Sequence, residues 1–148
     1  MGHAAPPLPF VRLAPPTFGG PVVVAVPHAG RLYPASLLAQ ACVGRPALET
    51  LEDRYADLLA ADAAGVTLFV AHYARAWIDL NRHPREIDPA MVAPPPPDTI
   101  ASAKVRGGLG LIPRRIAGRG EIYPAPLSPD DVRDRVESSH TPWHAALA

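Results

Sequence analysis

The fold is decided by the stretch VVVAVPHAG, residues 22–30. Five consecutive apolar residues, four of them valine, lie between Pro21 and Pro27. Such a short, β-branched run is typical of a strand that is buried on both faces of a parallel or mixed sheet. The predicted strand ends at Pro27, so His28 opens the loop at its carboxyl end.

Outward from this strand, the pattern alternates between helices and further strands. Apolar periodicity predicts helices over about 34–42 and 51–64, and apolar runs predict strands at 66–70 and 76–80. This order of strand, helices, strand and strand predicts an α/β fold, a three-layer sandwich in which helices flank a mixed sheet.

The remaining segments have weaker patterns. Residues 1–20 are rich in proline and predict an irregular N-terminal arm, so the domain is expected to span 21–148. Residues 84–126 lose periodicity and predict a long, mostly irregular excursion. A final helix is predicted from Ser128, which begins a capping-box pattern, and Pro142 is expected to bend or break it.

The composition excludes several classes of protein. With 148 residues, of which 48% are apolar and 19% charged, the chain suits one compact domain rather than a disordered tail. Its 14 basic and 14 acidic residues cancel, so neither nucleic acid nor an anionic membrane is an expected partner. The single cysteine, Cys42, lies in an apolar helical stripe and is interpreted as a core residue. Since the sequence has no disulfide pair, targeting signal or membrane-length apolar run, we expect a cytoplasmic protein.

His28 is the first candidate site residue. It follows a predicted strand, and in open α/β sheets ligands bind beyond the carboxyl ends of the strands. An imidazole at that place can ligate a metal ion or move a proton. The alternative is a structural histidine that bonds to a backbone carbonyl at the strand end.

The pair Asn81-Arg82 is the second candidate, because it follows the predicted strand 76–80. A guanidinium can bind both oxygens of a carboxylate, and a neighbouring amide can add a donor. The sequence contains 13 arginines, so a surface or capping arginine is the simpler explanation on spacing alone.

Two carboxylates on the predicted helix 51–64 form a third candidate. Asp53 and Asp57 share one face of it, which suits a solvated face or, at the helix start, a metal ligand. Asp53 also forms a capping-box-like pair with Thr50.

A fourth candidate is the pair His140 and His144, which have the spacing of a helical metal pair. No glutamate follows the first histidine, and Pro142 disturbs the helical geometry between them. A metal site at this pair is therefore the weakest of these hypotheses.

Taken together, four blocks of the sequence resemble the N-formylglutamate amidohydrolase family. They are VVVAVPHAGRLYP (22–34), LEDRYADLL (51–59), YARAWIDLNR (73–82) and GLGLIPR (108–114). Their order is far more specific than any one block, and the resemblance covers about residues 20–148. It implies a fold similar to that of zinc carboxypeptidases and aspartoacylases, with a hydrolytic metal at the strand ends.

The resemblance also implies roles for individual residues. His28 resembles a first metal ligand, and Asp53 is the better of the two helix carboxylates for a second, with zinc as the expected ion. Asn81 and Arg82 resemble the pair that grips the substrate carboxylate, and Arg75 could add a second positive contact. The implied reaction is metal-assisted hydrolysis of N-formylglutamate, or of a similar N-acyl amino acid, to formate and the amino acid.

The sequence departs from the family in one respect. Members continue with a strand ending in an Asp-Leu-His-Ser-type block and a later strand containing glutamate, where the third ligand and the general base are expected. Neither block is present here, so no catalytic base is assigned. The alternative hypothesis is a truncated or degenerate non-catalytic domain that binds a small carboxylate or a protein partner. In that form, an uncovered edge of the sheet should promote self-association.

Overall fold

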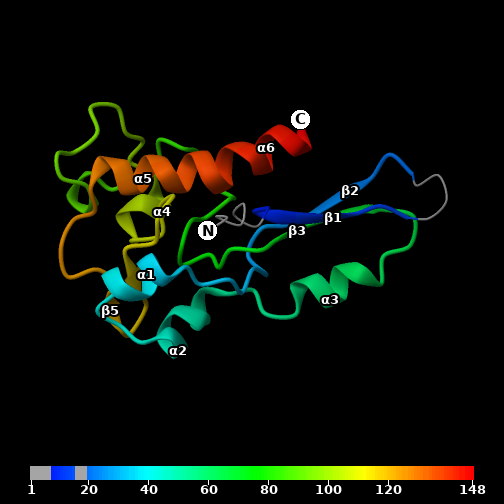
Figure 1. The fold of residues 1–148 in the computed structure, drawn as a ribbon, viewed down its shortest axis with the longest axis horizontal. Helices are drawn as coiled ribbons and strands as arrows, with labels where there is room; N and C mark the ends of the chain where they lie inside the picture. Colours follow the sequence, from blue (N-terminus) through cyan, green and yellow to red (C-terminus); the bar gives the residue numbers. More distant parts are fainter. Residues whose placement is uncertain (1–7, 16–19) are drawn as a thin grey trace, which may run out of the picture.

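The computed structural model describes residues 8–15 and 20–148 and has the predicted α/β fold. Its main sheet has three strands in the order β1-β3-β2 (Figure 1). β1 (Phe10–Leu13) runs antiparallel to β3 (Thr67–Ala71), and β2 (Val23–Val26) runs parallel to it. The sheet is therefore mixed, as the sequence predicts.

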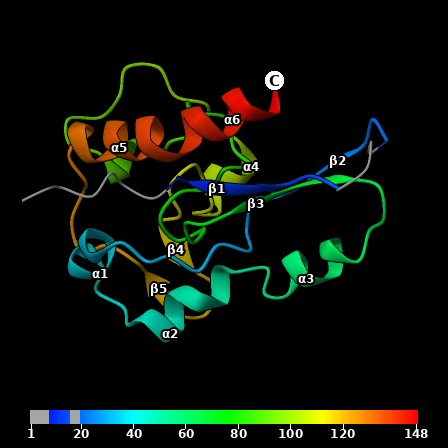
Figure 2. The same cartoon turned by 45° about the vertical axis from the view of Figure 1, so that its right-hand side comes forward.

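Helices cover both faces of this sheet. Figure 1 and Figure 2 both show α3 (Ala56–Ala61) on one side and α6 (Thr141–Leu147) on the other. Along β3, Leu68 packs in the cluster that includes α3, whereas the Phe69 ring lies 6.3 Å from the ring of Trp143 in α6. Alternating side chains of the central strand thus face two apolar layers.

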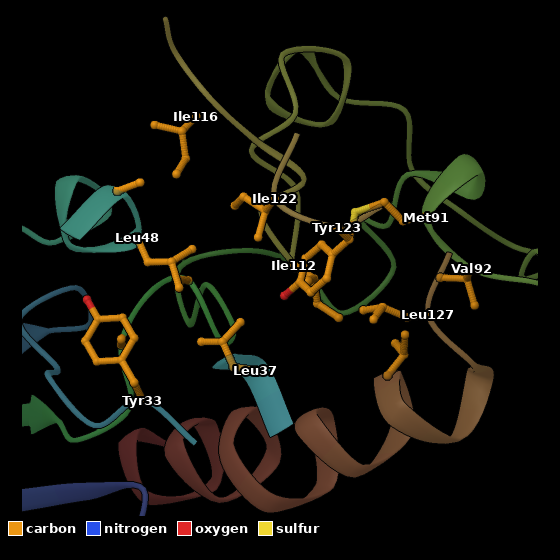
Figure 3. Close-up of a cluster of buried hydrophobic side chains, with 14 residues drawn as sticks. Tyr33, Leu37, Leu48, Met91, Val92, Ile112, Ile116, Ile122, Tyr123 and Leu127 are labelled. Atoms are coloured by element: carbon orange, nitrogen blue, oxygen red, sulfur yellow. The ribbon is translucent and has the colours of Figure 1, made fainter. Parts of the chain in front are cut away.

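The largest core cluster lies beside the sheet and contains no residue of its three strands (Figure 3). Short elements enclose it, and most of its side chains are aliphatic. Residues of α1 (Ala35–Gln40), α2 (Arg45–Leu48), the 3-10 helices η1 (Glu49–Leu51) and η2 (Pro89–Met91) and β4 (Arg115–Ile116) belong to the cluster or pack against it. The other short elements of this part of the chain are α4 (Ala103–Arg106) and β5 (Gly120–Glu121). The predicted excursion 84–126 is thus mostly irregular, but Ile112 and Ile122 anchor it in this core.

The predicted helix start at Ser128 is confirmed. The Ser128 hydroxyl accepts a hydrogen bond from the Asp131 N–H, and the Asp131 carboxylate accepts one from the Ser128 N–H. This reciprocal pair caps α5 (Pro129–Arg135), whose first N–H groups would otherwise lack acceptors.

Pro142 changes the helix before it rather than ending it. α5 passes through a π-helical turn, η3 (Val136–His140), directly into α6. There the Thr141 N–H donates to the Val136 carbonyl, five residues back. Because proline has no N–H and its ring crowds the preceding turn, a widened turn accommodates it.

Replacing Ser128 with alanine should lower the free energy of unfolding by about 1 kcal/mol, because the Asp131 N–H loses its acceptor. Urea denaturation measures the change. Ser36→Ala, at an exposed position of α1, is the control and should leave stability nearly unchanged. Equal losses in both variants would contradict the capping role.

The predicted irregular arm is wrong for residues 10–13, which form β1. The reason is long-range packing, since the ring of Phe10 lies 5.5 Å from that of Phe69 and 5.8 Å from that of Trp143. The first seven residues of the predicted arm, and 16–19, lie outside the described residues.

β2 is an edge strand, so the prediction that it is buried on both faces is wrong. Among the described residues, β2 pairs only with β3. Val22 and Val23 are exposed, whereas Val26 is buried. The apolar run therefore marks a strand with an uncovered edge.

The predicted helix 51–64 is interrupted between η1 and α3. Tyr55 has a φ of 72°, in the left-handed region. The backbone N–H of Asp53 donates to the carbonyl of His28 at 3.0 Å instead of to a helical carbonyl. The predicted cap by Thr50 also fails, because its hydroxyl donates to a backbone carbonyl within its own turn.

α3 packs on the sheet through alanines and not through its leucines. Ala56 and Ala60 lie against the cluster of β2 and β3 side chains. Leu58 and Leu59 are exposed. The apolar side of α3 therefore lies at the surface.

The apolar run 76–80 is buried, but it is not a strand. Its side chains enter two different core clusters, Ala76 in one and Ile78 in the other. The Asp79 N–H donates to the Leu111 carbonyl at 2.7 Å in an isolated contact. Burial between the two clusters, not sheet pairing, explains why this segment is apolar.

Cys42 is exposed, so its interpretation as a core residue is wrong. α1 ends at Gln40, and of the predicted apolar stripe only Leu37 is buried. In the described part of the chain, no helix has the length and apolarity needed to cross a bilayer.

Candidate functional site

One buried carboxylate, that of Asp79, brings four candidate residues together. Its side chain has no exposed surface. Oδ1 lies 2.6 Å from Nε2 of His28 and accepts the Asn81 N–H at 2.9 Å. Oδ2 accepts Nε–H of Arg75 at 2.9 Å and lies 3.7 Å from Nε of Arg82. Residues from two separate sequence blocks thus meet at a single side chain.

The loop after β2 brings His28 to this carboxylate. It lies against the segment that follows β3, where the Leu32 N–H donates to the His72 carbonyl at 2.9 Å. Gly30 permits the close approach, because a Cβ at this position would lie 2.0 Å from the carbonyl oxygen of Tyr73. A side chain at residue 30 therefore cannot fit without a backbone shift.

Gly30→Ala should lower the free energy of unfolding by more than about 3 kcal/mol. The added methyl meets backbone atoms, which cannot rotate away as a side chain would. Thermal and urea denaturation measure the loss. Gly20→Ala is the matched control, because its Cβ would make only an ordinary contact at 3.6 Å. Similar stability of the two variants would show that the approach of the two segments is not tight.

His28 lies between two carboxylates. Besides the contact to Asp79, its Nδ1 lies 3.1 Å from Oδ2 of Asp53, whose side chain is 59% exposed. A neutral imidazole has only one N–H, and a carboxylate has none, so a neutral ring satisfies one of these contacts. A second proton, or a metal ion shared by Nδ1 and Asp53, satisfies both.

The two arginines of the site are mostly buried, and each is anchored by its Nε. Arg82 donates Nε–H to the Leu109 carbonyl at 3.2 Å and a terminal N–H to the Asn81 carbonyl at 2.9 Å. Arg75 donates its Nε–H to Asp79. Within the described residues, no hydrogen bond uses the terminal nitrogens of Arg75. These donors can therefore bind an anion from outside.

Asp79 remains an anion although it is buried. Burial by itself raises the pKa of a carboxyl group, because it removes the charge from water. The hydrogen bond and charge of His28, the charge of Arg75 and the Asn81 N–H outweigh this effect, so the pKa of Asp79 lies below its ordinary value. The carboxylate can thus orient the surrounding donors at neutral pH.

A second buried carboxylate, Glu52, holds the segment that carries Asp53. Its side chain is 1% exposed and accepts hydrogen bonds from the Tyr33 hydroxyl and from Arg54, the latter at 2.9 Å. Burial and the contact with Glu52 raise the pKa of Tyr33, which stays protonated as a donor. These contacts join the loop after His28 to the loop that carries Asp53.

His140 and His144 each lie within hydrogen-bond distance of a backbone carbonyl oxygen. Nε2 of His140 lies 2.8 Å from the Arg82 carbonyl oxygen, and Nε2 of His144 lies 2.9 Å from that of Leu80. Their rings lie 4.2 Å apart. The pair therefore fastens the C-terminal helix to the segment that carries Asp79.

The two helix carboxylates separate in the structure. Asp57 pairs with Arg31 at 3.1 Å, whereas Asp53 lies at His28. Across residues 8–15 and 20–148, no three side chains of His, Cys, Asp or Glu are grouped so that they could hold a metal ion. His28 and Asp53 therefore provide two donors.

Asp79 was missed in the sequence reasoning, although it is the centre of the site. The signal was present, because an aspartate inside an apolar run is almost never fully buried unless it is paired. A strand over 76–80 would pair through its backbone, so the strand prediction assigns no partner to the Asp79 side chain. Glu52 carried no comparable signal in the sequence.

Comparison with known proteins identifies the family of the chain. The sequence matches the family model of N-formylglutamate amidohydrolase over residues 20–148. No curated protein matches it. The solved structure of N-formylglutamate amidohydrolase from Ralstonia eutropha JMP134 is similar, with 36% sequence identity and a TM-score of 0.85. The match covers 94% of this chain and 50% of that chain, so the present chain spans about half the length of this structural neighbour. By sequence and by fold, the chain belongs to the N-formylglutamate amidohydrolase family.

Proposed function

We propose that this chain supplies the metal-binding and carboxylate-binding residues of a site that hydrolyses the N-formyl amide of N-formylglutamate or a similar N-acyl amino acid. The observation that carries the proposal is the convergence of His28, Arg75 and Arg82 on the Asp79 carboxylate. The family match supports this choice of substrate class. The products are formate and the free amino acid.

The arginines bind the carboxylates of the substrate in this proposal. N-formylglutamate carries two carboxylates, and a guanidinium binds such a group through paired N–H donors. Asp79 holds Arg75 by Nε and leaves its terminal nitrogens for the substrate. Arg82 lies at the same oxygen of Asp79 and is held by the Leu109 carbonyl. The side-chain amide of the exposed Asn81 would add a neutral donor.

His28 and Asp53 would hold the divalent ion, and zinc is the expected metal. A histidine ligand commonly donates its other ring N–H to a carboxylate, which is the relation of Nε2 to Asp79. The separation of 3.1 Å between Nδ1 and Oδ2 of Asp53 suits two atoms that each lie about 2.0–2.2 Å from one ion. These contacts fit two of the roughly three protein ligands of a catalytic zinc site. The bound ion would supply Lewis acidity for the attack of water on the formyl carbonyl.

Arg82→Ala tests the substrate-binding role in zinc-supplemented formate-release assays. The variant should raise KM for N-formylglutamate at least tenfold and change kcat much less, since the carboxylate contact is the same before and during the reaction. Arg85→Ala is the matched control, because Arg85 is paired with Asp98 at the surface nearby. An unchanged KM in Arg82→Ala, or an equal rise in the control, would contradict this role.

The hydrolytic proposal itself has a direct test. Formate release is measured for the zinc-loaded chain alone and together with the unmatched half of the Ralstonia eutropha protein. Release in either sample supports the proposal. Its absence in both overturns it.

A second candidate function is carboxylate binding without hydrolysis. It is favoured by the two-donor metal site in the described residues. Calorimetry with N-formylglutamate in the presence of a chelator distinguishes the two. Metal-independent binding that is lost in Arg82→Ala, with no formate release under any condition, would support the binding function.

A further inference from the structure

The C-terminal helix holds the backbone around Arg82 through two histidines. Nε2 of His140 lies 2.8 Å from the Arg82 carbonyl oxygen, and Nε2 of His144 lies 2.9 Å from the Leu80 carbonyl oxygen. A carbonyl oxygen only accepts hydrogen bonds, so each ring carries a proton at Nε2. The two bonded carbonyls flank Asn81. The histidines therefore fix the backbone from which the Arg82 side chain starts.

The helix is itself fixed on the sheet between these two histidines. Trp143 is buried, and its ring lies 5.8 Å from the ring of Phe10 in β1 and 6.3 Å from that of Phe69 in β3. His140 and His144 are four residues apart on the continuous helix of α5, η3 and α6 (Figure 1), so they share one face. The position of residues 80–82 is thus tied to the core of the sheet through α6.

The guanidinium of Arg82 depends in turn on this backbone. It donates Nε–H to the Leu109 carbonyl at 3.2 Å and a terminal N–H to the Asn81 carbonyl at 2.9 Å. Because Asn81 lies between the two carbonyls that the histidines bind, a shift of this backbone moves an acceptor as well as the arginine. Nε of Arg82 would then leave its place 3.7 Å from Oδ2 of Asp79.

The histidine pair tolerates little positive charge. Burial lowers the pKa of His140, and the charges of His144 and His83 act in the same direction. The bond to the Arg82 carbonyl and the charge of Asp79 act against them, but the pKa of His140 stays below its ordinary value. Protons on both rings would also place two like charges on rings that lie 4.2 Å apart. Since an unfolded histidine takes up its proton at about pH 6.5, this contribution to stability is complete above that pH and is lost below it.

We propose that His140 and His144 are positioning residues, which hold Arg82 in place to bind a carboxylate as long as the two rings are uncharged. Acidification then releases α6 from residues 80–82 and weakens carboxylate binding. The binding of a carboxylate by Arg82 rests on the proposed function. The hold of the helix on residues 80–82 does not.

Hydrogen exchange tests this hold without any ligand. The protection factors of the Asp79 and Asn81 amides, which are both hydrogen-bonded, are measured in the full chain at about pH 7.5, above the ordinary histidine pKa. His144→Leu should lower both at least tenfold, because leucine donates no hydrogen bond. His144→Gln should keep most of the protection, because its amide donates from about the position of Nε2. His144 is exposed, so both variants should fold, and melting temperatures check this.

The matched control is His72→Gln. A ring nitrogen of His72 also lies close to a backbone carbonyl oxygen, that of Leu8 at 2.7 Å, but this contact does not involve residues 80–82. The control should leave the protection of both amides unchanged.

Calorimetry with N-formylglutamate in the presence of a chelator tests the effect on carboxylate binding. His144→Leu should bind at least fivefold more weakly than the unchanged chain, and His144→Gln within about twofold of it. Between about pH 7.5 and 5.5, on either side of the ordinary histidine pKa, affinity and protection should fall at least fivefold in the unchanged chain. The double variant His140→Gln with His144→Gln should lose much less, because neither glutamine takes up a proton.

Each outcome decides the inference. Loss of protection in His144→Leu with rescue in His144→Gln, and a smaller effect of acid in the double variant, supports it. Unchanged protection in His144→Leu, equal losses in His144→Leu and His144→Gln, or a similar loss in His72→Gln overturns it. An acid effect of the same size in the double variant also overturns it. If the protection follows the expected pattern but no chain binds N-formylglutamate, only the proposed function fails.

Discussion

Asp79→Asn is expected to lower the free energy of unfolding by about 3–5 kcal/mol, the usual cost of removing one partner from a buried ion pair. The substitution keeps the size of the side chain but removes the charge that faces Arg75 and His28. An asparagine also cannot accept hydrogen bonds at both side-chain atoms. Urea denaturation at neutral pH measures the loss.

The same variant should weaken metal binding by about tenfold to a hundredfold, the effect usually seen when a carboxylate behind a histidine ligand is removed. Asp98→Asn is the control for both measurements, because Asp98 pairs with Arg85 at the surface and its side chain is 69% exposed. It should change stability by less than about 1 kcal/mol. If Asp79→Asn behaves like this control, Asp79 does not organise the site.

Arg135→Ala is expected to lower the free energy of unfolding by a similar amount, about 3–5 kcal/mol. Arg135 is fully buried, and within the described residues no carboxylate forms a salt bridge with it. Its guanidinium donates to the Trp77 carbonyl, the Tyr123 hydroxyl and the Gln40 side chain, at 2.8–2.9 Å. It also lies 4.0 Å over the ring of Trp77. Alanine would leave a cavity and three unpaired acceptors.

Arg135→Met separates packing from hydrogen bonding. Methionine fills much of the same volume but donates no hydrogen bond. The loss of stability in Arg135→Met should therefore fall between zero and the loss in Arg135→Ala. Arg133→Ala, at an exposed position two residues earlier, is the control and should change stability little. Equal stability of Arg135→Ala and Arg133→Ala would show that Arg135 does not join the helix to the core.

The strands that carry the fold were predictable, because their apolar runs are short and bounded by proline or glycine. β2 and β3 lie where the sequence places them, within a residue at each end. The parallel pairing follows from the helices between them. β1 was not predictable from its proline-rich surroundings, because its pairing depends on the distant rings of Phe69 and Trp143.

The candidate site was predictable in its parts but not in its centre. His28 and Asn81-Arg82 each follow an apolar run of the sequence, and this position alone suggested a site. The sequence does not show that Asp79 joins them, since contacts across 51 residues depend on the fold. The sequence also does not predict the break in the helix before α3, because this break depends on a distant contact. The Asp53 N–H donates to the carbonyl of His28 and not to a helical carbonyl.

We propose that His28 and Asp53 share a divalent ion, and calorimetric zinc titration measures whether they do. The control for Asp53→Asn is Asp57→Asn, since Asp57 lies four residues later and pairs with Arg31 instead. We predict one zinc per chain, bound at least tenfold more weakly by Asp53→Asn and with unchanged affinity by Asp57→Asn. No zinc binding by the unchanged chain, or equal affinity in all three proteins, would contradict the claim.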